Sequence, residues 1–105
     1  MTESPRIKQI REWLAETPDD PELRYALALE HRSAGDTAGA AEQLKALIAD
    51  KPDFVASYLM LAQALVTLIR DDDAKDVLRN GVAAAKRAGN EHAMGEMQGM
   101  LESLS

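Results

Sequence analysis

The sequence predicts an all-α protein of about six helices, arranged as antiparallel helical hairpins that stack into a short solenoid. The first observation behind this prediction is an internal repeat. A pattern of apolar residues and prolines recurs at a spacing of 34 residues, with Leu27-Ala28, Ala40, Leu44 and Pro18-Asp19 returning as Leu61-Ala62, Ala74, Leu78 and Pro52-Asp53. A repeat of this length is typical of stacked hairpins, in which each unit leaves an apolar face open until its neighbour covers it.

Composition and length support the same fold class. Aromatic residues make up 4% of the chain, so the core must consist of alanine, leucine, isoleucine, valine and methionine, which suits closely packed helices better than sheets. At 105 residues, the chain is long enough for one continuous core but not for two. Because cysteine is absent, packing alone must provide stability.

The first helix is expected to begin at Pro5 and to run to about Glu16. Ser4 precedes it, and its hydroxyl can accept a hydrogen bond from a free backbone N–H of the first turn. One face of this helix carries the apolar residues Ile7, Ile10, Trp13 and Leu14. Since Ile10 and Leu14 precede Leu44 and Ile48 by the repeat spacing, residues 5–17 read as the second helix of an incomplete unit.

A first full unit is expected over residues 21–54. Asp20-Pro21 repeats the cap-and-proline start, and Gly35 should end the helix near Ala34 by adopting a left-handed conformation. Asp36 should cap the next helix, which runs to about Ala49 and ends before Lys51-Pro52-Asp53.

A second full unit is expected over residues 55–88. Its first helix should begin near Phe54, and its second should start at Asp71-Asp72-Asp73, where acidic side chains favour a helix N-terminus. The second helix should extend to Ala88-Gly89-Asn90, because Lys86 stands where a proline stood one repeat earlier.

The last segment, residues 90–105, should form a helix from about Glu91 to Leu104. One side of this helix carries Met94, Met97, Leu101 and Leu104. We interpret it as a capping helix that covers the open end of the stack. The alternative is an amphipathic helix that swaps onto a partner.

These residues resemble the tetratricopeptide repeat family, which implies a right-handed solenoid. The matching positions are Leu27-Ala28, Gly35-Asp36, Ala40, Leu44 and Pro52 in the first unit and Tyr58, Leu61-Ala62, Ala74, Leu78 and Gly81 in the second. Gly81 fits a position where two helices approach closely. Arg24 and His31 depart from the large apolar or aromatic residues usual in the family. Ile69-Arg70 replaces a Gly-Asp turn, so we expect the second turn to be displaced.

Several functions are not expected from this sequence. The net charge of −6 opposes binding to nucleic acid, whose affinity for proteins depends on neutralising phosphates. No stretch of about 18 apolar residues or signal-like segment is present, so we expect no membrane span and a cytoplasmic location. His31 and His92 lie 61 residues apart without a third partner, and Asp71-Asp72-Asp73 lacks the pattern of a calcium loop. We expect no enzymatic activity, no cofactor and no metal.

The resemblance implies instead a concave groove, lined by the first helices of successive units, that receives a peptide or a helix of a partner protein. Carried over to this sequence, the candidate partner-binding residues are Tyr25, Leu29, Arg32, Leu59, Met60, Gln63 and Val66, with Glu22, Ala26 and Ala56 beside them. Some family members grip a C-terminal carboxylate with basic residues, but Tyr25, Leu29 and Met60 occupy the corresponding places here. We therefore expect an apolar ligand. The alternative is a homo-oligomer whose groove is filled by its own or a neighbouring chain.

Overall fold

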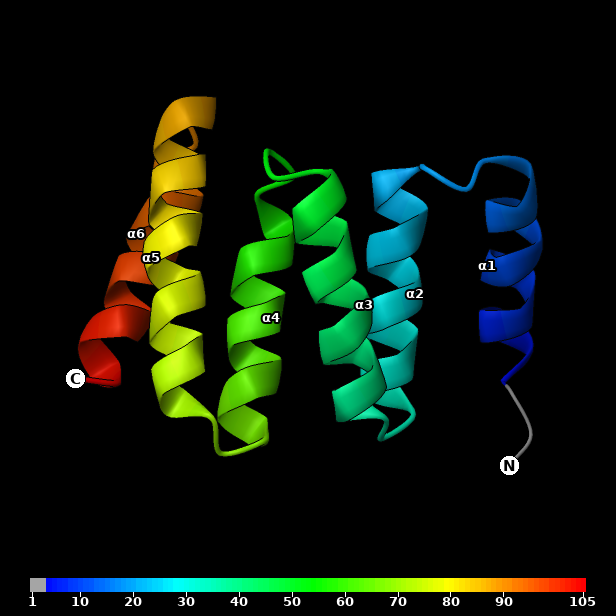
Figure 1. Ribbon diagram of the computed structural model, residues 1–105, viewed down its shortest axis with the longest axis horizontal. Helices are drawn as coiled ribbons and strands as arrows, with labels where there is room; N and C mark the ends of the chain where they lie inside the picture. Colours follow the sequence, from blue (N-terminus) through cyan, green and yellow to red (C-terminus); the bar gives the residue numbers. More distant parts are fainter. Residues whose placement is uncertain (1–3) are drawn as a thin grey trace.

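The computed structural model describes residues 4–105, which form six α-helices and no strand. The helices are α1 (Pro5–Glu16), α2 (Pro21–Ser33), α3 (Thr37–Asp50), α4 (Ala56–Thr67), α5 (Asp71–Ala88) and α6 (Glu91–Ser103). They follow one another in a row with alternating direction, and α1 and α6 lie at opposite ends of the row (Figure 1). Each helix packs mainly against its neighbours in the sequence. The all-α class and the hairpin arrangement are therefore as predicted.

Three helix starts follow the predicted capping residues. The Ser4 hydroxyl accepts from the Ile7 backbone N–H at 3.1 Å, Asp20 accepts from Glu22 at 2.9 Å, and Asp36 accepts from Gly39 at 2.9 Å. The fourth helix is the exception, because it begins at Ala56 rather than near Phe54. The chain first makes turn-like bonds three residues apart, such as Ser57 N–H to Phe54 carbonyl at 3.3 Å, before the regular helical pattern sets in.

The main core cluster contains residues of every helix from α2 to α6, and Gly81 marks a close helix approach within it. A Cβ atom at Gly81 would lie 2.7 Å from Tyr58 Cβ and would also collide with Met97 Sδ. The small-residue role predicted for Gly81 is thus confirmed. The neighbouring Tyr58 hydroxyl donates to the Pro52 carbonyl at 2.6 Å, and burial raises the pKa of this tyrosine above its ordinary value.

Trp13 does not lie in the buried stripe that the sequence predicted for the first helix. Ile7 and Ile10 are buried, but 44% of the Trp13 surface is exposed. The reason is the position of α1 at the end of the row, where it packs mainly against α2. A helix covered on one side buries a narrower stripe than a helix with neighbours on both sides.

The prediction that the second turn is displaced was wrong. Ile69 adopts φ of +59°, in the left-handed region that Gly35 occupies one repeat earlier with φ of +90°. The hydrogen bonds also correspond, since Gly35 N–H donates to the Arg32 carbonyl at 3.0 Å and Ile69 N–H donates to the Val66 carbonyl at 2.9 Å. The turn therefore keeps its place and geometry, and a β-branched residue is held in a conformation that normally favours glycine.

Replacing Ile69 with glycine is expected to raise the free energy of unfolding by about 1 kcal/mol, because the strain disappears. Little burial is lost, since 89% of the Ile69 surface is exposed. The reciprocal change, Gly35→Ile, should lower the stability by a similar amount. Urea denaturation of the two variants measures both effects, and a destabilised Ile69→Gly variant would contradict the assignment of strain to this turn.

Candidate partner-binding groove

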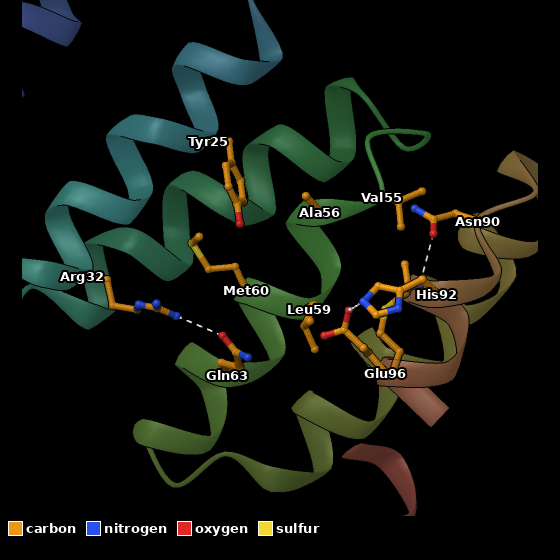
Figure 2. A pocket seen from close by; sticks show the side chains of 12 residues that line it. Tyr25, Arg32, Val55, Ala56, Leu59, Met60, Gln63, Asn90, His92 and Glu96 are labelled. Atoms are coloured by element: carbon orange, nitrogen blue, oxygen red, sulfur yellow. Dashed lines mark hydrogen bonds and ion pairs between the residues drawn. The ribbon is translucent and has the colours of Figure 1, made fainter. Parts of the chain in front are cut away.

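A surface cavity of about 290 Å³ lies between α2, α4 and α6. Its walls come from three helices that are separated in the sequence but face a common space (Figure 2). The lining residues are Tyr25 and Arg32 from α2, Val55, Ala56, Leu59, Met60 and Gln63 at and along α4, and Asn90, His92, Ala93, Glu96 and Met97 at and along α6. We call this cavity the groove.

Most of the predicted binding residues lie together in the groove, but two do not. Five of the seven line it, namely Tyr25, Arg32, Leu59, Met60 and Gln63. Leu29 and Val66 are absent from its lining and are instead partly buried against the hydrophobic core. Leu29 lies on the same face of α2 as Tyr25 and Arg32, and Val66 lies on the same face of α4 as Leu59 and Gln63, so both belong to the predicted faces although they do not line the cavity.

The middle of the groove is apolar, and a polar pair lies on each side of it. Met60 is buried and forms part of its base, and Leu59 is partly exposed beside it. On the α2 side, Arg32 Nη1 donates to Gln63 Oε1 at 3.0 Å. On the α6 side, His92 Nε2 lies 2.7 Å from Glu96 Oε1. Figure 2 shows the two pairs on opposite sides of Leu59 and Met60.

Tyr25 is held at the groove by an aromatic contact. Its ring lies 5.8 Å from the ring of Phe54, at an angle of 62°, which is the edge-to-face arrangement that aromatic pairs prefer. Phe54 belongs to the turn before α4, so this contact connects the wall from α2 to the segment that leads into the next wall. Phe54 therefore supports the apolar side of the groove although it does not line the groove.

The α6 wall was missed in the sequence, where this helix was interpreted as a cap, with an amphipathic helix that swaps onto a partner as the alternative. Met97 of α6 is fully buried in the core, and Ala93 and Glu96 line the groove. A signal was available, because α2, α4 and α6 begin at Pro21, Ala56 and Glu91, which are equally spaced. The last helix thus takes the place of a first helix in a further unit. It packs on α5 of its own chain.

Within residues 4–105, no group of three or more histidine, cysteine, aspartate or glutamate residues is arranged to hold a metal ion. Across the same residues, none of the helices combines the length and apolar character that crossing a membrane requires. His31 is largely buried, and its Nδ1 lies 3.2 Å from Asp36 Oδ2, whereas His92 is exposed on α6. The two histidines therefore occupy separate surroundings.

Comparison with known proteins decides the family. Two family models, both described as tetratricopeptide repeat, match residues 1–51 and 31–94, and the second of these spans more than half of the chain. The chain belongs to the tetratricopeptide repeat family. Tetratricopeptide repeat domains generally mediate protein–protein interactions and are generally non-catalytic.

Similar proteins come from Pseudomonas aeruginosa, Salinibacter ruber and Bordetella parapertussis. It is 29% identical over 98 residues to the TPR repeat-containing protein PA0015 of Pseudomonas aeruginosa, with 93% of each chain covered. It is 32% identical to a tetratricopeptide repeat domain protein from Salinibacter ruber, whose solution structure matches with a TM-score of 0.81 over 84% of this chain and 89% of that one. Protein BPP2914 from Bordetella parapertussis has the same fold, with a TM-score of 0.81 at 21% identity over 98% of this chain and 89% of that one.

Proposed function

We propose that this tetratricopeptide repeat protein is a non-enzymatic adaptor in the cytoplasm, which binds an apolar segment of a partner protein in the groove between α2, α4 and α6. The observation that supports this proposal is the composition of the groove. Its centre offers Leu59, Met60 and the ring of Tyr25, and its two polar pairs lie at the sides. Such a surface favours the binding of a ligand that places an apolar side chain in the middle and backbone polar groups at the edges.

The size of the groove limits the ligand. A cavity of about 290 Å³ is at the lower end of the range for ligand pockets, so it can enclose one or two apolar side chains of a peptide or a short helix. Burial of apolar surface contributes about 25 cal/mol per Å², from which the cost of ordering the ligand must be subtracted. We expect dissociation constants on the order of micromolar.

The groove is tested with peptides selected from a random library on the wild-type protein. Leu59→Glu places a carboxylate in the apolar centre and is expected to weaken binding of the selected peptides at least about tenfold, because the charge must be desolvated or the anchor excluded. Ala83→Glu is the matched control, since Ala83 is exposed on α5 outside the groove lining. Isothermal titration calorimetry measures the peptide affinity of each variant, and equal affinities for the two variants would refute the proposal.

Sedimentation of the same proteins distinguishes a partner from a second copy. A monomer that binds peptides supports the adaptor. A concentration-dependent dimer that Leu59→Glu dissociates and Ala83→Glu leaves intact would show instead that the groove holds a neighbouring chain.

A further inference from the structure

Helices α1 and α6 are complementary halves of one repeat unit. Each full unit pairs a first helix with a second helix, α2 with α3 and α4 with α5. Ile10 of α1 precedes Leu44 of α3 by the repeat spacing, so α1 is a second helix. α6 is a first helix, because it begins as far after α4 as α4 begins after α2. Among residues 4–105, α1 packs mainly against α2 and α6 mainly against α5, so neither contacts a partner helix of its own unit.

The face of α1 that belongs against a first helix is open. In the second full unit, Gly81 of α5 is buried and lies against Tyr58 of α4. The residues that precede Gly81 by one and two repeats are Leu47 and Trp13. Leu47 is fully buried, whereas 44% of the Trp13 surface is exposed. Trp13 therefore occupies a position that is enclosed in both full units and uncovered in α1.

The face of α6 that belongs against a second helix is open as well. Met60 and Glu96 line the groove from α4 and α6 and are 36 residues apart, which gives the correspondence between these two helices. At this spacing, three buried residues of α4 correspond to three less enclosed residues of α6, namely Tyr58, Ala62 and Leu65 to Met94, Gln98 and Leu101. Met94 and Leu101 are only partly buried, and Gln98 is exposed. This face of α6 therefore lacks the cover that α5 gives to α4.

The two open faces match each other in composition and in charge. In a contact between α1 and the α6 of another copy, Trp13 takes the place of Gly81, and Met94 takes the place of Tyr58. A methionine sulfur packs favourably against an aromatic ring. α1 carries three basic and two acidic residues, whereas α6 carries three acidic residues and neither lysine nor arginine. The contact thus joins helices of opposite net charge.

Two polar side chains make this contact looser than the contacts within a unit. Ala62 and Ala74 are fully buried in the second full unit. Gln98 stands at the position of Ala62 in α6, and Arg6 stands at the position of Ala74 in α1. Longer side chains keep two helix axes farther apart than alanine does. We therefore expect weak and reversible association, with a dissociation constant on the order of a hundred micromolar.

We propose that the chain associates head to tail with further copies of itself, with α6 of one copy packed against α1 of the next. The contact completes a repeat unit from two chains and continues the row of helices, since α1 and α6 lie at its opposite ends (Figure 1). Because the two surfaces differ, the interface is heterologous and adds copies one after another instead of closing a two-fold dimer. The groove is a separate surface, because Trp13, Met94 and Leu101 do not line it.

The test mixes two variants that are each blocked at one end. Trp13→Glu places a carboxylate on the open face of α1, and Leu101→Glu places one on the open face of α6. In sedimentation velocity up to about one millimolar protein, the average mass of the wild type should rise with concentration, and each variant alone should associate at least about tenfold more weakly. An equimolar mixture should form a heterodimer and nothing larger, because one intact α6 face meets one intact α1 face.

Control variants separate this contact from other effects. Circular dichroism checks that each variant is folded, and Gln98→Lys, at an exposed position of the same α6 face, replaces Leu101→Glu if that variant unfolds. Leu59→Glu in the groove and Ala83→Glu on α5 should leave the association unchanged. A wild type that stays monomeric, blocked variants that do not form the heterodimer on mixing, or association lost in Leu59→Glu would each overturn the proposal. The outcome is independent of whether the groove binds peptides.

Discussion

Replacing Leu44 with alanine is expected to lower the free energy of unfolding by about 3 kcal/mol, which is typical for a fully enclosed leucine. Leu44 lies in the middle of α3 and is completely buried. The helix that carries it packs against both α2 and α4, so the cavity left by the substitution weakens two helix interfaces at once. Urea denaturation measures the loss, and a decrease below about 1 kcal/mol would indicate that the stack collapses around the cavity.

The matched comparison is Ile10→Ala in the first helix. Ile10 precedes Leu44 by one repeat and is also buried, but α1 packs mainly against α2. In a row of units that contact only their neighbours, a terminal helix can open while the rest stays folded. Hydrogen exchange should therefore lose protection in α1 alone for Ile10→Ala and along the whole stack for Leu44→Ala. Uniform loss in both variants would contradict this picture.

The second large effect is expected at Gly81. Gly81→Ala should lower the free energy of unfolding by about 2 kcal/mol, even though alanine is the better helix former, because the added methyl overpacks the contact between α5 and its neighbours. Tyr58 Cβ belongs to the start of a side chain and cannot move without its helix, whereas Met97 can adjust. Thermal or urea denaturation gives the change in stability.

Two other glycines serve as controls for the helix preference of alanine. Among the described residues, no heavy atom outside the adjacent residues and the nearby backbone of α6 lies within 4 Å of a Cβ built at Gly95 or Gly99. Gly95→Ala and Gly99→Ala should each raise the stability by about 0.5–1 kcal/mol. If Gly81→Ala behaved like these two, the close approach at Gly81 would not constrain the fold.

Local signals explain why much of the fold could be predicted. A capping side chain forms its hydrogen bond within three residues of the helix start. Three helix starts could therefore be predicted from the sequence alone, at Ser4, Asp20 and Asp36. The exposed side of Trp13 and the left-handed Ile69 were mispredicted because both depend on tertiary context. The first depends on which neighbours a terminal helix has, and the second on a repeat geometry that overrides local preference.

The groove was predictable only in part for a related reason. The repeat spacing places Tyr25, Leu59 and Met60 on helices of the same kind, and the structure brings them together. The repeat spacing does not reveal the hydrogen bond between Arg32 and Gln63, because this contact joins two helices at a sequence separation of 31 residues. The departure at Arg24 was visible in the sequence, but its ion pair with Asp50 was not, because that contact joins two different helices.

The single-file arrangement of the helices has a mechanical consequence. Because α1 and α6 lie at opposite ends of the row, a pull applied between these two helices acts along the line of helix contacts (Figure 1). Every interface along the line carries the same load, so we expect α1, which packs mainly against one neighbour, to separate before the middle hairpins. Under tension the molecule is therefore expected to lengthen in steps.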